Sequence, residues 1–251
     1  MRTVTHLAAA LTLGITLTAC GGAAKSDADS SAATAAAAAQ PATTKGDRPV
    51  SNTVVWTPLL DATMSQWRAW KADAMSAGWN VAGDVLSKDG PVADLQSRAQ
   101  YANFELEFDW MVGEVGNAGI FYRVTEEYDK PYWSGPEYQL LDDARHPDGQ
   151  DRLRTAGAAY ALYAGPKDVV KPAGQWNTAR IVVAGNFVEH WLNGQQVVQY
   201  ELGSADWLAK VKASKFTEFP NYGLAKRGFL SIQGDHSGTL SIRAMRIREL
   251  P

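Results

Sequence analysis

The sequence predicts an all-β fold, an antiparallel sandwich or jelly roll, and three observations indicate it. Short runs of alternating apolar and polar residues recur through residues 54–251, bounded by Gly, Asn, Asp and Pro. The pair Asn193-Gly194 separates two such runs, as in a tight β-hairpin. Helical periodicity is confined to short pieces. Many strands separated by turn signals favour packed antiparallel sheets over an α/β fold.

Residues 1–19 have the pattern of an export signal. Arg2 supplies a positive start, and the apolar run from Leu7 to Leu17 is too short to span a membrane as a helix. The order Leu17-Thr18-Ala19-Cys20 resembles a bacterial lipobox, which predicts cleavage before Cys20 and acylation of its sulfur. Cys20 is the only cysteine, so no intramolecular disulfide can form.

Residues 20–53 are rich in Ala, Ser, Thr and Gly and lack aromatic side chains. Such a segment cannot bury enough apolar surface to offset the entropy of ordering it, so we expect a disordered tether behind the acylated cysteine. Together, the anchor and the tether predict a cell-envelope protein held on a membrane through lipid. Gly21, rather than Asp, follows the cysteine, which favours the outer membrane, with the protein facing the periplasm.

Residues 54–251 amount to about 200 residues, enough for one large β domain. The formal net charge of −3 argues against nucleic acid as a partner. Nine Trp and nine Tyr gather in this domain. Aromatic rings of this kind pack in cores and also stack on the apolar faces of sugars.

Alternation with period two places strands along the domain. In Asn103–Trp110, Phe104, Leu106 and Phe108 share one face, while Glu105 and Glu107 share the other, as in a half-buried strand. The same pattern predicts strands over Gly119–Val124, Ala179–Ala184, Gly228–Gln233 and Leu240–Arg248.

The clearest local signal is the hairpin formed by Phe187–Leu192, the turn Asn193-Gly194 and Gln195–Tyr200, because Asn-Gly suits the positive φ angles of a type I′ turn. Helical pattern appears over Thr63–Ala69 and Ser204–Ala213.

Polar side chains interrupt several predicted strands on a common side. In Pro136–Asp142, Glu137 and Gln139 lie on one face, opposite Tyr138 and Leu140. Similar positions are held by polar residues of other strands, namely Arg123, His190 and Gln233. We expect all five polar residues to converge on one groove of a concave sheet face.

Histidine is scarce in the domain, which contains only His146, His190 and His236. Their spacing gives no structural zinc site. Gln233-Gly-Asp-His236 places Asp235 and His236 in a loop at a strand end, where catalytic groups often lie. The acidic run around His146 offers ligands for a hard divalent cation, so a bound cation stays a possibility.

Six motifs in order make the sequence similar to a known family. They are Tyr101-x-Asn-Phe-Glu-Leu, Gly116-Asn-Ala-Gly-Ile-Phe-Tyr-Arg123, Gly135-Pro-Glu-Tyr-Gln-Leu-Leu-Asp-Asp143, Trp176-Asn-Thr, Glu189-His-Trp-Leu-Asn-Gly194 and Ile247-Arg-Glu-Leu250. This order closely resembles the 3-keto-disaccharide hydrolase domain family over about Trp56 to Leu250. The resemblance implies a concanavalin-like jelly-roll sandwich, export, and action on glycosides whose sugar is a ketone at carbon 3.

Two motifs depart from the family pattern. The family usually has Gly-Asn-Ser-Gly where this chain has Gly116-Asn-Ala-Gly119. It usually has Leu-Gln-Asp-His-Gly where this chain has Ile232-Gln-Gly-Asp-His-Ser237. The inserted Gly234 leaves the register of Asp235 and His236 open.

The implied reaction is β-elimination at carbons 1 and 2 followed by hydration. It needs a base, an acid for the departing oxygen and a stabiliser of the enolate. We expect His190 or His236 to be the base and Glu137 the acid or second base. Arg123, Gln139 or a cation would stabilise the enolate. The further candidates for substrate binding are Gln233, Trp133, Asp142 and Asp235.

Two other functions stay open. The spacing Glu137-x-Gln139-x-x-Asp142 resembles the carboxylate signature of retaining laminarinase-like glycosidases, with Gln and Asp in place of two of the acids. A non-catalytic carbohydrate-binding module could instead use Trp133, Tyr138 and Trp191 as stacking platforms. The fold does not decide between them, because the same sandwich carries lectins and enzymes.

Overall fold

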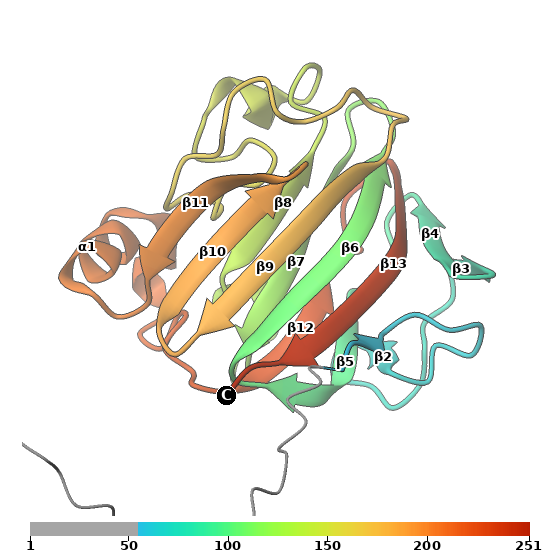
Figure 1. Cartoon of the computed structure of the whole chain (residues 1–251), viewed down its shortest axis with the longest axis horizontal. Coiled ribbons are helices and arrows are strands. Elements are labelled where there is room, and N and C mark those ends of the chain that lie inside the picture. The colour runs from blue at the N-terminus through green and yellow to red at the C-terminus, as the bar shows by residue number, and fades with distance from the viewer. Residues whose placement is uncertain (1–54) are drawn as a thin grey trace, which may run out of the picture. The chain divides into compact units, whose positions relative to one another are not determined.

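The computed structural model describes residues 55–251, which form two antiparallel β-sheets packed against each other (Figure 1). The predicted all-β jelly-roll sandwich is confirmed. The signal, the lipidated Cys20 and the tether predicted for residues 1–53 lie outside the described residues. Within residues 55–251, no helix has the length and apolar character needed to cross a membrane.

The large sheet, in front in Figure 1, has eight strands. In spatial order they are β11 (Gln195–Glu201), β10 (Phe187–Leu192), β9 (Asn177–Ala184), β6 (Phe104–Val112), β13 (Thr239–Glu249), β4 (Val85–Asp89) and β3 (Trp79–Ala82), with the short β1 (Thr57–Pro58) paired to β13. All five strands predicted in this sheet by alternation or by the hairpin signal are present.

The small sheet lies behind it and has five strands. Their order is β2 (Trp67–Ala69), β5 (Leu95–Tyr101), β12 (Gly228–Ile232), β7 (Asn117–Val124) and β8 (Glu137–Leu141). β8 is therefore an edge strand. Its free edge is covered by the following loop, in which Gly157 donates to the carbonyl of Gln139 at 2.9 Å and Tyr160 to that of Glu137 at 3.2 Å.

The core lies between the sheets and follows the predicted alternation. β6 buries Phe104, Leu106, Phe108 and Trp110 in it. From the small sheet, Ile120, Tyr122, Tyr138 and Leu140 pack into the same core. The acidic residues of β6 consequently point outward from the large sheet, and Glu137 and Gln139 of β8 point outward from the small one.

The hairpin prediction is confirmed, because β10 and β11 pair antiparallel across the two-residue turn Asn193-Gly194. Both turn residues have positive φ, 49° for Asn193 and 82° for Gly194, as a type I′ turn requires. The helix expected over Ser204–Ala213 is also present, as α1 (Ala205–Ala213). Ser204 caps its first turn by accepting from the backbone N–H of Trp207 at 3.1 Å.

The helix expected over Thr63–Ala69 is wrong. Asp61 accepts from the backbone N–H of Thr63 at 2.7 Å and from the hydroxyl of Ser65 at 2.7 Å, which holds a turn there. Met64 has a positive φ of 51°, outside the helical region. The chain then extends into β2, because its pairing with β5 satisfies the backbone that a helix would have used.

In the described part of the chain, residues 55–251, three short 3₁₀ helices lie in the connections: η1 (Pro131–Trp133), η2 (Pro147–Gln150) and η3 (Lys215–Glu218). They come from three separate parts of the chain. Each supplies one side chain to a cavity on the outer face of the small sheet, Tyr132 from η1, Asp148 from η2 and Lys215 from η3.

Candidate active site

A cavity of about 190 Å³ lies on the outer face of the small sheet. We call it the small-sheet cavity. Its floor comes from β7, β8 and the end of β12, and its rim from the connecting segments. The lining residues are Asn117, Glu137, Gln139 and Gln233 on the floor and Tyr132, Asp148, Tyr160, Lys215, Asp235 and His236 on the rim. The cavity is small for a ligand pocket, which suits a single sugar unit better than a long chain.

Glu137 is the buried acid of this cavity. It begins β8, and only 6% of its surface is exposed. Its carboxylate has room because Gly119, on the neighbouring strand β7, has no side chain: a Cβ there would collide with the Glu137 carboxyl group. Burial raises the pKa of Glu137 to about 8, against the opposing attraction of Lys215. Glu137 therefore holds its proton at neutral pH.

Lys215 lies across the cavity from the sheet, on η3. Its ammonium is 4.4 Å from the ring centre of Tyr160 and 5.9 Å from that of Tyr132, so two aromatic faces hold it. Burial lowers the pKa of Lys215, while the nearby Glu137 carboxyl acts in the opposite sense. The pair places a proton-holding acid and a cation beside the same space.

Asp235 and His236 reach the cavity from the loop after β12. Gly234 fixes the path of this loop. Its N–H donates to Asp94 Oδ1 at 2.7 Å, and a Cβ on it would collide with the backbone of Val92 and Ala93. The inserted glycine thus directs both following side chains to the rim. Burial lowers the pKa of His236, with Asp235 opposing the shift, so the imidazole is a neutral proton acceptor near pH 7.

The floor also carries buried polar atoms without partners. The side-chain oxygens Gln139 Oε1 and Gln233 Oε1 are buried and make no hydrogen bond, and neither does Asp235 Oδ1 on the rim. Unpaired buried polar groups are costly in a folded protein, so their concentration in one cavity indicates that a polar ligand completes their hydrogen bonds. A sugar, with many hydroxyl groups, has the matching chemistry.

Five of the residues named from sequence therefore lie together: Glu137, Gln139, Gln233, Asp235 and His236 all line this cavity. Four others named from sequence do not: Arg123, His190, Trp133 and Asp142. Each of the four has another place in the structure.

His190 does not face the groove, and its expected position there is wrong. It lies on β10 of the large sheet, and none of its surface is exposed, because the inner face of that sheet is the core. Its Nδ1 lies 3.0 Å from the carbonyl of Gly157 and its Nε2 2.9 Å from the hydroxyl of Tyr122. Burial lowers the pKa of His190 to about 4. This neutral histidine holds the loop that covers β8 and cannot touch a ligand in the small-sheet cavity.

Arg123 is also turned away from the cavity. Its φ of 53° breaks the alternation of β7, so its side chain leaves the face shared by Asn117 and Gly119. The guanidinium donates to the carbonyl of Ala102 at 3.2 Å and to that of Gly185. Arg123 ties two backbone turns together instead of contacting substrate.

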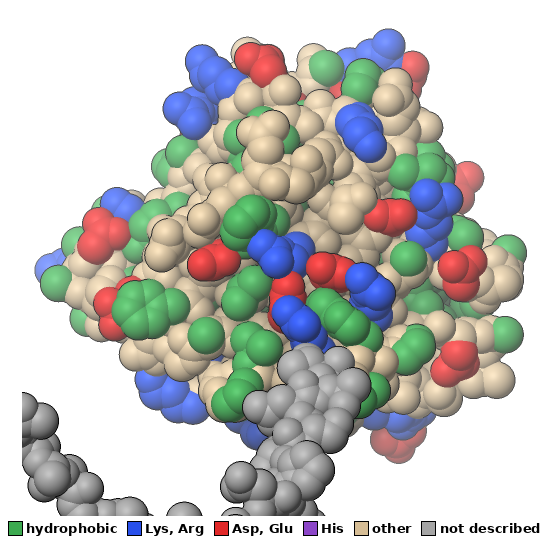
Figure 2. All heavy atoms as spheres, in the orientation of Figure 1, with side chains coloured by type: hydrophobic (Ala, Val, Ile, Leu, Met, Phe, Trp, Pro, Cys, Tyr) green, Lys and Arg blue, Asp and Glu red, His purple; other side chains and the backbone are tan. Residues whose placement is uncertain are grey.

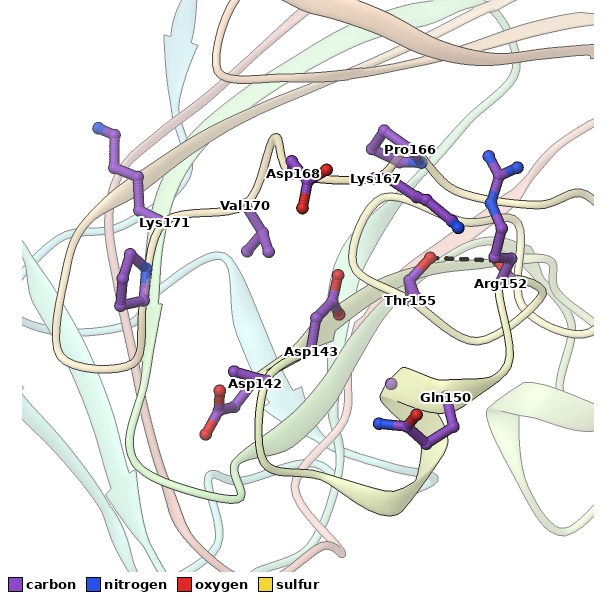
Figure 3. A pocket seen from close by; sticks show the side chains of 13 residues that line it. Asp142, Asp143, Gln150, Arg152, Thr155, Pro166, Lys167, Asp168, Val170 and Lys171 are labelled. Atoms are coloured by element: carbon purple, nitrogen blue, oxygen red, sulfur yellow. Dashed lines mark hydrogen bonds between the residues drawn. The ribbon is translucent and has the colours of Figure 1, made fainter.

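Trp133 and Asp142 point elsewhere too. Trp133 stacks on Phe219 with ring centres 5.2 Å apart, and its neighbour Tyr132 lines the cavity instead. Asp142 accepts from the backbone N–H of Val115 at 2.9 Å and lines a second, larger cavity of about 460 Å³, shown in Figure 3. That cavity lies among the loops after β8 and contains neither Glu137 nor His236.

The structure adds five lining residues that the sequence analysis did not select: Asn117, Tyr132, Asp148, Tyr160 and Lys215. Alternation could have found Asn117, because it shares a face of β7 with Gly119. Nothing in the sequence marks Lys215, since only the folded path of η3 brings it across the sheet.

The possible cation site around His146 gains no support. Among residues 55–251 there is no group of three His, Cys, Asp or Glu side chains arranged to hold a metal ion. The acids near His146 make other contacts: Asp143 accepts from the backbone N–H of Ala156 at 2.8 Å, and Asp148 pairs with Arg154 at 3.0 Å.

Comparison with known proteins places the chain in a family. Residues 55–248 match the model of the 3-keto-alpha-glucoside-1,2-lyase-like domain. A protein of Bacteroides thetaiotaomicron named 3-keto-disaccharide hydrolase is 31% identical over 221 residues, covering 75% of this chain and 76% of the relative.

Solved structures show the same fold. A candidate glycosyl hydrolase from Parabacteroides distasonis superposes with a TM-score of 0.72 at 30% identity, covering 78% of this chain and 94% of that one. A Bacillus subtilis protein described as having a galectin-like fold superposes with a TM-score of 0.51 at 13% identity over 78% of this chain and 95% of that one, which is a likeness of fold alone. The family match spans nearly all of the described domain, and this chain therefore belongs to the 3-keto-alpha-glucoside-1,2-lyase-like domain family.

Proposed function

We propose that this protein cleaves glycosides or disaccharides whose sugar carries a ketone at carbon 3, by elimination across carbons 1 and 2 and then hydration. The observation that carries the proposal is the small-sheet cavity, where Glu137, with its raised pKa, and His236, with its lowered pKa, line the same space. An acid that keeps its proton and a base that lacks one are what an elimination requires.

The chemistry follows from the ketone. A carbonyl at carbon 3 acidifies the proton on carbon 2, and a base that removes it leaves an enolate. The enolate expels the oxygen on carbon 1, which an acid protonates, and a carbon 1–carbon 2 double bond forms. Water then adds its oxygen to carbon 1 and its proton to carbon 2. The net result is hydrolysis of the glycosidic bond without attack on an oxocarbenium ion.

The residues of the cavity fit these roles. His236 is the base, because its lowered pKa keeps the imidazole neutral. Glu137 is the acid, because its raised pKa keeps the carboxyl group protonated. Gln139 and Lys215 lie beside the same space and supply hydrogen-bond donors to the developing negative oxygen.

The two alternatives are less well supported. A retaining glycosidase needs two carboxyl groups about 5 Å apart on opposite sides of the bond. Asp142, the proposed partner of Glu137, is instead bonded to Val115 and lines the second cavity. As for a binding module, Tyr138 is buried in the core and Trp191 lies under Arg180 on the large sheet, so neither is a free stacking platform.

The test is a paired substrate assay with the purified protein. We expect cleavage of a 3-keto-glucoside and no cleavage of the unmodified glucoside. In D₂O the released sugar should carry deuterium on carbon 2, above the exchange measured without enzyme, because hydration delivers a solvent proton there. Cleavage of the unmodified glucoside without deuterium uptake would instead indicate a retaining glycosidase, and binding without cleavage would indicate a binding module.

We also propose that the protein works in the cell envelope, held by lipid on Cys20 in the outer membrane and facing the periplasm. This rests on the lipobox-like Leu17-Thr18-Ala19-Cys20. Labelled palmitate should enter the wild-type protein but not Cys20→Ser, and the substituted protein should leave the membrane fraction. Equal labelling of both proteins would contradict this proposal.

A further inference from the structure

Three polar side chains connect a loop to the floor of the small-sheet cavity. His146 precedes η2, Asn117 begins β7 and Gln139 lies on β8. His146 Nε2 lies 3.5 Å from the Asn117 amide, and the Asn117 amide lies 3.3 Å from that of Gln139. We call these three residues the amide relay. It ends at the cavity, where the other end of the Gln139 amide is buried without a partner.

The backbone hydrogen bond that His146 accepts determines which atoms donate and which accept along the relay. His146 Nδ1 accepts from the backbone N–H of Asp148 at 3.1 Å, which caps η2. A backbone N–H can only donate, so Nδ1 carries no proton. An imidazole must then hold its proton on Nε2, and Nε2 is therefore a donor. The Asn117 side chain must therefore present an acceptor, its Oδ1, to His146 Nε2.

The proton on His146 Nε2 determines how the carboxamides of Asn117 and Gln139 are turned. With Asn117 Nδ2 turned to His146, two N–H donors would face each other, and Gln139 Oε1 would stay buried without a partner. A carboxamide turned by 180° exchanges its oxygen and nitrogen without changing shape. With both amides turned, His146 Nε2 donates to Asn117 Oδ1, and Asn117 Nδ2 donates to Gln139 Oε1. The contact between two donors disappears, and the end of the Gln139 amide that is buried without a partner is now the NH₂ group, which points into the cavity.

We propose that the amide relay fixes Gln139 as a hydrogen-bond donor to the oxygen on carbon 3 of the substrate, with His146 and Asn117 as positioning residues. This rests on the proposed function. A ketone oxygen and an enolate oxygen can only accept, so a cavity floor that presented an amide oxygen there would repel both. An N–H donor binds the ketone, and its bond strengthens as the oxygen becomes negative in the enolate. The relay thus gives the cavity its preference for oxidised sugars.

The sharpest variant is Asn117→Asp, which keeps the shape and removes the donor. A carboxylate accepts from His146 Nε2 but cannot donate to Gln139 Oε1, so Gln139 must turn its NH₂ group to Asp and its oxygen to the cavity. We expect kcat to fall about 100-fold, as for loss of one donor to an oxyanion. If Gln139 Nε2 instead donates to Asn117 in the wild type, the introduced carboxylate still accepts that hydrogen bond and kcat does not change. An unchanged kcat would therefore overturn the relay.

His146→Asn is the neutral companion variant. Asn also accepts from the N–H of Asp148 and so keeps the cap of η2, but it has no group in the place of Nε2. We expect kcat to fall several-fold with little change in Tm, whereas His146→Ala should lower both. A His146→Asn protein with wild-type kcat would show that His146 only caps η2, which contradicts the proposal.

Two measurements separate the relay from the proposed reaction. In the ligand-free protein, the ¹⁵N chemical shifts of His146 should report the Nε2–H tautomer, and the Nδ1–H tautomer would overturn the relay whatever the activity. Calorimetry with 3-keto-glucose and glucose should show tighter binding of the ketone by the wild type and loss of that preference in Asn117→Asp. No preference in the wild type would overturn the contact to carbon 3. Failure of the cleavage assay with both results intact would instead count against the proposed function alone.

Discussion

The outer faces of both sheets carry acidic and other polar residues. On the large sheet these residues form ion pairs, whereas on the small sheet they are buried and incompletely hydrogen-bonded. On the large sheet, Glu107 pairs with Arg246 at 2.6 Å and Asp109 with Arg243 at 3.2 Å. These arginines also stack on tryptophan rings, Arg243 on Trp176 at 4.1 Å from the ring centre. Figure 2 shows acidic and basic side chains alternating across the middle of this face.

On the small sheet, the outward residues are covered and incompletely bonded. Glu137 and Gln139 are buried beneath the three 3₁₀ helices and their loops, and neither the cavity-facing end of the Gln139 amide nor Gln233 Oε1 makes a hydrogen bond. In both sheets, polar residues alternate with core residues along the strands. The difference is therefore one of cover and pairing: exposed, paired charges stabilise little and do no chemistry, whereas buried, unpaired groups are poised for a ligand.

The largest expected effect comes from one substitution made on each face. Glu137→Gln keeps the shape of the side chain but cannot donate or take the catalytic proton, so we expect kcat on a 3-keto-glucoside to fall by about 10²–10⁴. Glu107→Gln on the large sheet should leave kcat within about twofold, because its partner Arg246 is far from the chemistry in this scheme. Equal losses in the two proteins would break the comparison.

The second prediction is a pH dependence of the reaction. As the acid, Glu137 must be protonated, and its raised pKa lies at about 8. Activity should therefore be independent of this group below that value and fall about tenfold per pH unit above it. Rates of kcat/KM between pH 5 and 10 measure this, and a limb that rises with pH near 8 would mean that Glu137 acts as the base.

The same shift affects stability, with a defined sign. The folded protein holds the Glu137 proton more tightly than the unfolded chain, whose glutamate pKa is about 4.3. The stabilising contribution is present below about 4.3 and is lost as pH rises to about 8. Urea unfolding at several pH values should show a smaller decline over this window in Glu137→Gln than in the wild type.

The third prediction separates the two histidines. His190→Phe should lower the free energy of unfolding by about 1–3 kcal/mol, because the carbonyl of Gly157 loses its buried donor. Its folded fraction should keep near-normal kcat. His236→Ala should show the reverse, a loss of kcat with little change in urea midpoint. Loss of kcat in a stably folded His190→Phe protein would restore a catalytic role for His190.

The smallest effect is expected on the open face. The Arg246 side chain is half exposed and pairs with Glu107 beside Trp56. Arg246→Ala should cost about 1 kcal/mol or less in urea unfolding, since exposed ion pairs contribute little, and should leave kcat unchanged. A loss of unfolding free energy well above that would show that the ion pairs on the outer face of the large sheet are structurally essential.

Much of the fold could be predicted because strand alternation and the Asn-Gly turn are local. The strand of Phe104 to Trp110 and the turn at Asn193 depend on neighbours in sequence, and both are confirmed. The helix predicted over Thr63–Ala69 did not form, because hydrogen bonds accepted by Asp61 and pairing with β5 outweighed the helical spacing of this segment.

The site was predictable only in part. Alternation correctly put Glu137 and Gln139 on one face, yet it could not say which face of a strand is the core, and so it misplaced His190. A polar residue on the inner face of the large sheet has the same spacing as one on the outer face of the small sheet. Arg123 was misplaced for a different reason, since its positive φ reverses the alternation at one residue.

The sequence by itself determined the all-β class, the strands from β6 to β13 and the family, because these depend on local periodicity and on motifs in a fixed order. It also put Glu137 and Gln139 side by side. Only the tertiary structure decided what surrounds them. Three connections distant in sequence close over the small sheet, and one of them brings Lys215 to the cavity, while the loop after β12 brings His236. That cover removes water from Glu137, and this desolvation, which no local pattern encodes, changes an ordinary strand carboxylate into a candidate acid.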